Sequence, residues 1–377
     1  MNNKYLAALL VLLPLAFSMP AFNQAHIDHP TLAIGSTAPA FNLKSIDGKM
    51  YNLASFKNAK VLVIIFTCNH CPTAQAYEDR IIKLTSDYKS KGVAVVAIMP
   101  NDPASVQLSE LGYTDMGDTY EEMQLRAKNK KFNFPYLFDG ATEEVSRNYG
   151  PTATPHVFIF DSERKLRYSG RVDDVEKPTL TPNSFDTRNA IDALLAGKEV
   201  PVTTTKVFGC SIKWQEKSDW MIKAQAAWAK EPVTIDTIAA DGLKALFKNN
   251  TDKLLVVNVW ATWCGPCVAE FKDLMDIDKM YRGRDFKLIT VSADDPAKKD
   301  KALQFLKKQY ASNANYIFNI DDKYKLIEAI DPNWQGALPY TMLVEPGGKI
   351  VYTVNGAFDP AELKKVIVEN HLIGRYY

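Results

Sequence analysis

The chain has 377 residues, of which 46% are hydrophobic and 24% charged, and its formal net charge is +1. This length is enough for two to three domains, and the balanced charge gives no reason to expect a nucleic acid or another polyanion as a partner. Five cysteines are too few for a disulfide-based scaffold.

The first 21 residues have the features of a secretory signal peptide. Lys4 supplies a positive charge, residues 6–17 are apolar, and small residues at 16–18 or 19–21 offer cleavage sites. The apolar run is short for a membrane span, which needs roughly 20 residues; an uncleaved anchor is the alternative. We therefore expect an exported protein, periplasmic or in the cell envelope, outside the reducing cytosol.

The first half of the chain alternates strand patterns with helix patterns. Continuous apolar runs indicate strands buried on both faces, and Pro72 begins a helix because proline is tolerated in a first turn. In chain order we predict a hairpin at 41–53, a strand at 61–66, a helix at 72–91, a strand at 93–99, a helix at 120–131, a strand at 136–138, a hairpin at 156–169 and a helix at 185–195.

The second half repeats this order after a polar stretch at 211–231 that we expect to be partly helical. The predicted elements are a strand at 254–260, a helix at 266–280, a strand at 286–291, a helix at 298–310, a hairpin at 340–354 and a helix at 360–369. Strands that alternate with helices predict an α/β fold. We expect two thioredoxin-like domains, each a mixed central sheet flanked by helices.

Each half carries a Cys-x-x-Cys motif between a predicted strand and a predicted helix, formed by Cys68 and Cys71 and by Cys264 and Cys267. A helix N-terminus favours a thiolate, which is the form that attacks disulfides. Four-cysteine zinc sites usually place their pairs roughly 15–20 residues apart, so we expect two redox dithiols and no metal. Cys210 is left over, either as a third redox thiol or as a small buried side chain.

The sequence Val-Asn-Val-Trp-Ala-Thr-Trp-Cys-Gly-Pro-Cys, which ends at Cys267, resembles thioredoxin and, more closely, the exported TlpA/ResA-type thiol–disulfide oxidoreductases. The resemblance covers residues 233–373. It implies that Cys264 is the exposed attacking thiol, that Cys267 resolves the mixed disulfide and that Trp263 covers the site.

The same resemblance implies a cis-proline at Pro339, facing the dithiol, and a Leu338 backbone that pairs with a partner's extended chain. Glu270 follows Cys267 by three residues and shares its helix face. A matching glutamate in the TlpA/ResA type could move protons for the thiols, with a solvated surface charge as the alternative. Asn258 stands where thioredoxin has a buried aspartate, which makes a proton role for Glu270 more plausible.

The first motif and its proline, Cys-Asn-His-Cys-Pro, resemble a branch of peroxiredoxin-like thioredoxin-fold proteins, and the resemblance covers residues 34–216. It implies a cis-proline at Pro155, preceded by Thr154. Cys71 with the Pro-Thr after it resembles a peroxidatic Cys-Pro-Thr, and Cys68 takes the place of that family's threonine. The absence of a proline just before Thr67 weakens the assignment of a peroxidase.

His70 lies between the two thiols of the first motif. As a cation it could stabilise a neighbouring thiolate and make the first dithiol the more oxidising of the two; a solvated loop histidine is the alternative. Two thiols and a histidine also suit Cu(I), and His156 directly follows Pro155. Copper-delivery thioredoxin folds usually space their cysteines by three residues, however, not by two.

We therefore predict a signal peptide at 1–21, a peroxiredoxin-like domain at 30–216, a linker at 217–231 and a TlpA/ResA-like domain at 232–373. The predicted enzyme exchanges thiols and disulfides and relays electrons from the second dithiol to the first across a linker that, if flexible, lets the sites meet. The alternatives are a thioredoxin-coupled peroxidase, with Cys71 or Cys68 peroxidatic, and a copper-binding chaperone. We expect protein thiols or disulfides, an upstream thiol donor and, for the peroxidase, peroxide as partners, and no cofactor.

Overall fold

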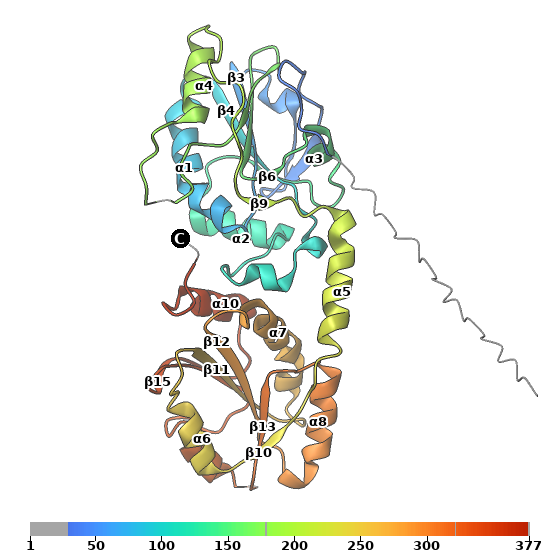
Figure 1. The fold of residues 1–377 in the computed structure, drawn as a ribbon, viewed down its shortest axis with the longest axis vertical. Helices are drawn as coiled ribbons and strands as arrows, with labels where there is room; N and C mark the ends of the chain where they lie inside the picture. The colour runs from blue at the N-terminus through green and yellow to red at the C-terminus, as the bar shows by residue number, and fades with distance from the viewer. Residues whose placement is uncertain (1–28, 178, 321, 376–377) are drawn as a thin grey trace, which may run out of the picture.

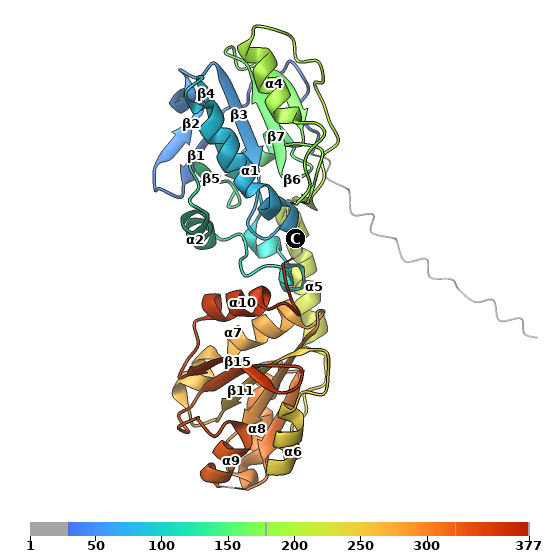
Figure 2. The same cartoon turned by 90° about the vertical axis from the view of Figure 1, so that its left-hand side faces the viewer.

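The computed structural model describes residues 29–177, 179–320 and 322–375. Figures 1 and 2 show two α/β bodies stacked along the long axis of the molecule, each built on its own sheet. The body that contains the first motif is called the first domain here, and the other the second domain. The predicted signal peptide at 1–21 lies outside the described residues.

The first domain has a seven-stranded mixed sheet whose central strand carries the dithiol at its end. From edge to edge the strands are β2 (Met50–Asn52), β1 (Asn42–Ser45), β5 (Tyr136–Phe138), β4 (Val93–Met99), β3 (Val61–Phe66), β7 (His156–Phe160) and β8 (Leu166–Gly170). Strand β3 pairs in parallel with β4 and antiparallel with β7. All six of its residues are buried, as the apolar run predicts.

Alternate residues of β3 face two different hydrophobic clusters because successive side chains of a strand point to opposite faces. One face packs against helices that include the one after the dithiol, and the other packs against a short helix and the N-terminal segment. The helices are α1 (Pro72–Lys89), α2 (Tyr120–Lys130), α3 (Glu144–Tyr149) and α4 (Asp186–Leu195). A separate small sheet pairs β6 (Ala153–Thr154) with β9 (Cys210–Ser211).

The second domain has a six-stranded mixed sheet with the same central arrangement. Its strands, in spatial order, are β10 (Asp236–Ile238), β13 (Ala314–Phe318), β12 (Phe286–Ser292), β11 (Leu254–Trp260), β14 (Tyr340–Glu345) and β15 (Lys349–Asn355). Its helices are α6 (Ala240–Phe247), α7 (Gly265–Tyr281), α8 (Lys299–Lys308), α9 (Lys323–Ile330) and α10 (Pro360–Glu369). Helices α7, α8 and α10 cover one face of the sheet, and α6 and α9 cover the other.

The two mixed sheets with flanking helices confirm the predicted α/β fold of two thioredoxin-like units. In each unit the dithiol strand has a parallel neighbour on one side and an antiparallel hairpin on the other. The structure also contains short 3₁₀ helices: η1 (Leu53–Phe56), η2 (Pro103–Ser105), η3 (Leu108–Leu111), η4 (Gln215–Lys217) and η5 (Pro296–Lys298). No helix in the described part of the chain is both long and apolar enough to cross a membrane.

The segment between the domains differs from the flexible linker that we considered. Residues Ser218–Trp228 form α5, an 11-residue helix with none of its residues buried. Figure 1 shows α5 beside both bodies. A helix rises only about 1.5 Å per residue and holds its ends apart, so the reach of a random coil does not apply to this segment.

The domains also contact each other directly. The Tyr281 hydroxyl donates to the carbonyl oxygen of Thr114 over 2.8 Å, and Arg375 pairs with Asp115 over 2.8 Å. Leu111 packs into the hydrophobic cluster of the second domain. Helix α10 and the C-terminal residues lie at the end of the second domain that faces the first (Figures 1 and 2).

Candidate redox sites

The second dithiol lies at the junction of β11 and α7. Cys264 is the N-cap residue of α7, and its sulfur accepts a hydrogen bond from the backbone N–H of Cys267 over 3.3 Å. A disulfide joins Cys264 to Cys267. The free N–H groups of a first helical turn stabilise negative charge. The position of Cys264 therefore suits a thiolate once the disulfide is reduced.

The exposure of Cys264 differs from the prediction. Its side chain is only 6% exposed, and that of Cys267 is fully buried, so the attacking thiol is not an open one. Trp263, the residue before Cys264, is 56% exposed. Burial of Cys264 follows from its place in the hydrophobic cluster under α7, a packing arrangement that the motif alone does not reveal.

The peptide bond between Leu338 and Pro339 is cis, as the resemblance implied. Pro339 precedes β14, the antiparallel neighbour of β11. No described segment of the chain forms a β-bridge with Leu338. The backbone edge that precedes the cis-proline is therefore left unpaired in the second domain.

Glu270 is a buried acid under the second dithiol, not a solvated surface charge. Its side chain is 5% exposed. Asn258 donates to its Oε1 over 3.0 Å, and the backbone N–H of Phe358 donates to its Oε2 over 3.1 Å. Burial raises the pKa of Glu270 to about 7, against the effect of these hydrogen bonds. A carboxyl group that titrates near neutral pH can exchange protons with its surroundings.

The first dithiol lies at the junction of β3 and α1, but the helix starts three residues later relative to the motif. Here the second cysteine, Cys71, is the N-cap residue, and α1 begins at Pro72. Cys68 Sγ lies 3.0 Å from the hydroxyl oxygen of Thr154, and Cys71 Sγ lies 3.6 Å from the carbonyl oxygen of the same residue. The bond from Thr154 to Pro155 is cis, as predicted.

Cys68 and Cys71 are both buried, at 2% and 0% exposure. Their surroundings nevertheless shift the two thiol pKa values in opposite directions. Burial, a hydrogen bond to Cys71 and the charge of Asp118 raise the pKa of Cys68. Burial opposes ionisation of Cys71 too, but hydrogen bonds from Cys210 and Cys68 and the charge of His70 hold its pKa well below the usual range. Of the two sulfurs, Cys71 is therefore the more acidic.

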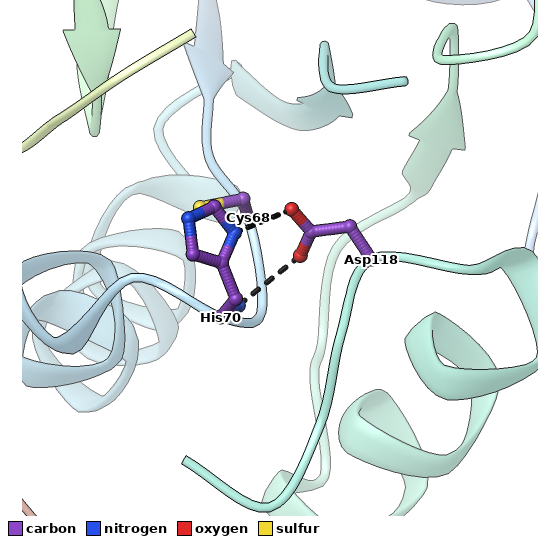
Figure 3. A group of neighbouring side chains, drawn as sticks. All are labelled: Cys68, His70 and Asp118. Carbon is purple, nitrogen blue, oxygen red and sulfur yellow. Dashed lines mark hydrogen bonds and ion pairs between the residues drawn. The ribbon is translucent and has the colours of Figure 1, made fainter. Parts of the chain in front are cut away.

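His70 is held in a buried ion pair (Figure 3). Its Nδ1 lies 2.6 Å from Oδ2 of Asp118, and the backbone N–H groups of Asn69 and His70 both donate to Oδ1. Burial disfavours the cation, but the charge of Asp118 and its hydrogen bond raise the pKa of His70. His70 is 2% exposed, which rules out the alternative of a solvated loop histidine.

Asp118 is the site residue that the sequence did not reveal. It belongs to a loop 48 residues after His70, outside any motif. Asn101 fixes its position by donating to Oδ2 over 2.7 Å. A buried cation requires an acidic partner. The sequence could therefore suggest that some acid pairs with His70, but not which one.

Cys68, His70 and Asp118 also offer ligand atoms within 4.8 Å of one another, a grouping that could hold a metal ion. Each oxygen of Asp118 already accepts two hydrogen bonds, however, so an ion would have to displace them. The copper alternative also relied on His156. Both of its ring nitrogens are engaged, by Thr152 and Ser169, and burial lowers its pKa to about 3. The geometry thus favours an ion pair over a copper site.

Cys210 lies at the first dithiol, although it is 139 residues from Cys71 in the chain. Strand β9 pairs antiparallel with β6, so that Cys210 is opposite Thr154. The backbone N–H of Cys210 donates to Sγ of Cys71 over 3.3 Å. Its side chain is half-buried, not fully enclosed.

A mixed sheet, a Cys-x-x-Cys motif at the start of a helix and a cis-proline beside it occur twice here, and together they define a tandem thioredoxin-fold protein. The family model described as Redoxin matches residues 33–187 and again residues 229–367, which is more than half of the chain. The chain therefore belongs to the Redoxin family and contains two copies of its domain.

Individual relatives match only parts of the chain. The thiol-disulfide oxidoreductase ResA of Oceanobacillus iheyensis is 26% identical over 113 residues, which are 28% of this chain and 50% of that protein. The thiol:disulfide interchange protein DsbE of Yersinia pestis is 26% identical over 166 residues, which are 42% of this chain and 78% of that protein. The chain spans only half the length of the ResA relative.

Among solved structures, a hypothetical protein from Sinorhizobium meliloti 1021 is 34% identical to this chain. The alignment covers 49% of this chain and 97% of that one, with a TM-score of 0.44.

Proposed function

We propose that this chain is an exported thiol–disulfide oxidoreductase that uses two dithiols, Cys264 with Cys267 and Cys68 with Cys71. The observation that carries the proposal is the second site, which combines a Cys-x-x-Cys pair at a helix N-terminus, a buried carboxyl group one turn along that helix and a cis-proline just before the neighbouring strand β14. The names of the ResA and DsbE relatives agree with this chemistry.

At the second site, Cys264 is the nucleophile and Cys267 the resolving thiol. The helix N-terminus stabilises the Cys264 thiolate, which attacks a partner's disulfide and forms a mixed disulfide. Cys267 then attacks Cys264 and releases the partner as a thiol. Glu270 takes up or releases the proton that this step requires, because its pKa of about 7 keeps both protonation states populated.

The unpaired backbone beside Pro339 suits a partner protein. An extended chain can add to an exposed strand edge through main-chain hydrogen bonds, whatever its sequence. Leu338 offers such an edge, and the exposed Trp263, next to Cys264 in the sequence, offers an apolar surface. Protein thiols or disulfides are therefore the substrate class that we propose for the second domain.

The relay from the second dithiol to the first is also a proposal. Neither cysteine pair is among the residues that hydrogen-bond across the domain interface or that line the roughly 1,090 Å³ cavity between the domains. Exchange between the sites therefore requires the domains to separate, or requires a second molecule of the protein. Such domain motions are the usual expectation for small interfaces within a chain.

A peroxidase is the second candidate, favoured by one observation. Cys71 is the N-cap residue of α1 and has a lowered pKa, which is the state required of a thiolate that attacks peroxide. The geometry selects Cys71 over Cys68 as the peroxidatic residue, because Cys68 has a raised pKa. The test is the rate at which hydrogen peroxide oxidises the reduced protein. A rate no higher than that of free cysteine with peroxide would argue against this candidate.

The main proposal is tested by disulfide reduction with insulin as the substrate. The full chain with Cys68→Ser and Cys71→Ser retains only the second site and should remain active. Adding Cys264→Ser should abolish activity, and adding Cys267→Ser instead should leave mixed disulfides with insulin that mass spectrometry detects. Full activity of the variant that lacks Cys68, Cys71 and Cys264 would contradict the assignment.

A further inference from the structure

The two domains differ at the backbone edge before the cis-proline. Among the described residues, this edge is unpaired in the second domain, whereas in the first domain another segment of the chain pairs with it. In the second domain no described segment pairs with Leu338, the residue before its cis-proline. In the first domain β9 pairs with the corresponding residue, Thr154, and brings a cysteine to the site. Cys210 therefore lies where a substrate protein that paired with this edge would place its cysteine.

The backbone is adapted to this close approach. Gly209 has a φ of +140°, and a Cβ atom at this position would lie 2.0 Å from the carbonyl oxygen of Thr154. Only glycine avoids that clash, so the approach of β9 to the cis-proline is built into the sequence. It places the N–H of Cys210 at 3.3 Å from Sγ of Cys71.

Access to the three sulfurs differs. Cys68 and Cys71 are 2% and 0% exposed, so an external thiolate cannot reach either without a rearrangement. Cys210 is half-buried and borders a cavity of about 350 Å³. It is the least buried of the three cysteines in the first domain.

Ionisable side chains of both signs border this cavity. His70 and Lys213 border it together with Glu110 and Glu176. Lys213 is paired with Glu110 over 2.5 Å, and Glu176 accepts a hydrogen bond from Thr73. The Nε2 atom of His70 is buried and has no hydrogen-bond partner among the described residues. The imidazole thus has one buried ring nitrogen at the cavity that no described residue satisfies.

We propose, building on the proposed function, that Cys210 is the exchange cysteine of the first domain: it forms a disulfide with Cys71, and external dithiols reduce the domain by attacking Cys210. The first step is internal. Cys210 loses its proton and attacks Cys71 Sγ in the oxidised Cys68–Cys71 pair. The Cys71–Cys210 bond forms, the Cys68–Cys71 bond breaks, and Cys68 takes up a proton.

The second step admits the external reductant. A thiolate of the dithiol attacks Cys210 Sγ, the Cys71–Cys210 bond breaks, and Cys71 leaves as a thiolate. The second thiol of the dithiol then attacks the mixed disulfide and releases Cys210, which is protonated. Two electrons pass from the dithiol to the domain. The direction of attack is favourable because a thiol of low pKa is the better leaving group, and Cys71 is that thiol.

Disulfide mapping tests the first part of this proposal. In the full chain with Cys264→Ser and Cys267→Ser, only three cysteines remain. Oxidation with one equivalent of diamide, acid quenching, alkylation of free thiols and trypsin digestion distinguish the two disulfides. A Cys68–Cys71 bond lies within the peptide of residues 61–80, whereas a Cys71–Cys210 bond links it to the peptide of residues 207–213. We expect both products, and only the linked pair after Cys68→Ser.

The kinetics of reduction test the second part. In the same background, Cys210→Ser should slow reduction of the oxidised protein by thioredoxin, a protein dithiol, by at least about tenfold, since a buried disulfide is shielded from attack. Ser211→Ala, on the same strand, is the matched control and should leave the rate unchanged. Gly209→Ala should slow reduction as Cys210→Ser does, because it displaces β9 with the thiol intact.

The outcomes separate this inference from the proposed function. If Cys68→Ser protein yields no linked pair and Cys210→Ser protein is reduced at the rate of its parent, the role of Cys210 is overturned, while a Cys68–Cys71 disulfide still supports a redox-active first motif. If no disulfide forms in any variant, the first dithiol itself is not redox-active.

Discussion

The two Cys-x-x-Cys motifs have the same spacing but place different cysteines at the start of the following helix. Helix α7 starts directly after its first cysteine, Cys264, whereas α1 starts directly after its second, Cys71. The N-cap position stabilises a thiolate, so we expect the nucleophile to be the first cysteine of one motif and the second of the other. A motif pattern therefore does not by itself identify the reactive sulfur; the start of the helix does.

The sites also differ in what surrounds the sulfurs. Under the second dithiol is a carboxyl group that is neutral or charged according to pH. Beside the first is an ion pair between His70 and Asp118, and a third thiol approaches from β9. The second domain thus has an open edge and a buried acid with a pKa of about 7, whereas the first has a filled edge and a buried ion pair. These features suit exchange with varied partners in one domain and an internally controlled reaction in the other.

The largest expected effect concerns the identity of the thiolate in the first domain. With Cys264→Ser and Cys267→Ser in place, thiolate absorbance at 240 nm should show a group that titrates well below the usual range of a cysteine, as at helix N-termini. Cys71→Ser should remove this titration entirely, and Cys68→Ser should retain it with a modestly higher midpoint, because one hydrogen bond to Cys71 is lost. The opposite pattern would assign the thiolate to Cys68.

The next effect concerns Glu270 and has a defined sign. Its pKa rises from 4.5 to about 7 on folding, so between these pH values the folded state keeps a proton that the unfolded state has lost. The stability of the oxidised protein should therefore fall as pH rises from about 4.5 to 7 and level off above. Glu270→Gln should remove this fall. At pH 8 the free energy of unfolding of the variant should exceed that of the parent by on the order of 2 kcal/mol.

Denaturant unfolding at pH 5 and pH 8 measures this difference. Glu328→Gln, an exposed glutamate on α9, is the matched control and should change neither value. In the reduced protein, Glu270→Gln should also shift the pH profile of Cys267 alkylation, since the carboxylate no longer opposes a nearby thiolate. If both profiles match the parent, Glu270 is only a structural acid.

A smaller effect concerns the ion pair at the first dithiol. The His70 cation stabilises the reduced, thiolate form, and so should raise the reduction potential. His70→Gln should make the first dithiol more reducing by about 30 mV, or tenfold in the equilibrium with glutathione. Asp118→Asn should shift the potential in the same direction, because a buried histidine without its acid becomes neutral.

Equilibration with glutathione also compares the reduction potentials of the two domains. We expect the first dithiol to be the more oxidising, so that electrons flow from Cys264 and Cys267 toward the first domain. Measured in the full chain with one dithiol at a time replaced by serines, the potentials decide the direction. If the first dithiol has the more negative potential, the relay runs the other way and the role of His70 is wrong.

Much of the fold could be predicted because its signals are local. The apolar runs of β3 and β11 and the prolines at the starts of α1 and α10 indicated the corresponding elements. The elements that we missed include α6, α9 and β13, which are short and lie between stronger patterns. The helical form of α5 was expected only in part, and its effect on the linker was not.

The sites were predicted as far as each motif extends and no further. The cysteines and the acid at Glu270 lie within or next to the motifs, and the two cis-prolines, far from them in the sequence, were predicted from the family resemblances. Asp118 and the pairing of Cys210 with Thr154 depend on loops that return to the site from distant parts of the chain. Burial of Cys264 depends on tertiary packing. Such information becomes available only when the sheet and its connections are known.

The smallest expected effect concerns the interface that keeps the two sites apart. Among the described residues, no cysteine takes part in the hydrogen bonds that cross the interface, so weakening it should speed electron transfer within one chain. Tyr281→Phe removes the hydrogen bond to Thr114, which is worth about 1 kcal/mol, so single-turnover transfer should accelerate by up to about fivefold if separation limits it. Tyr324→Phe alters a tyrosine that is 82% exposed and should have no effect. Stopped-flow tryptophan fluorescence at low protein concentration measures the rate. A slower rate in Tyr281→Phe protein would mean that the observed contacts guide the transfer instead of opposing it, and a rate that rises with protein concentration would assign the exchange to pairs of molecules.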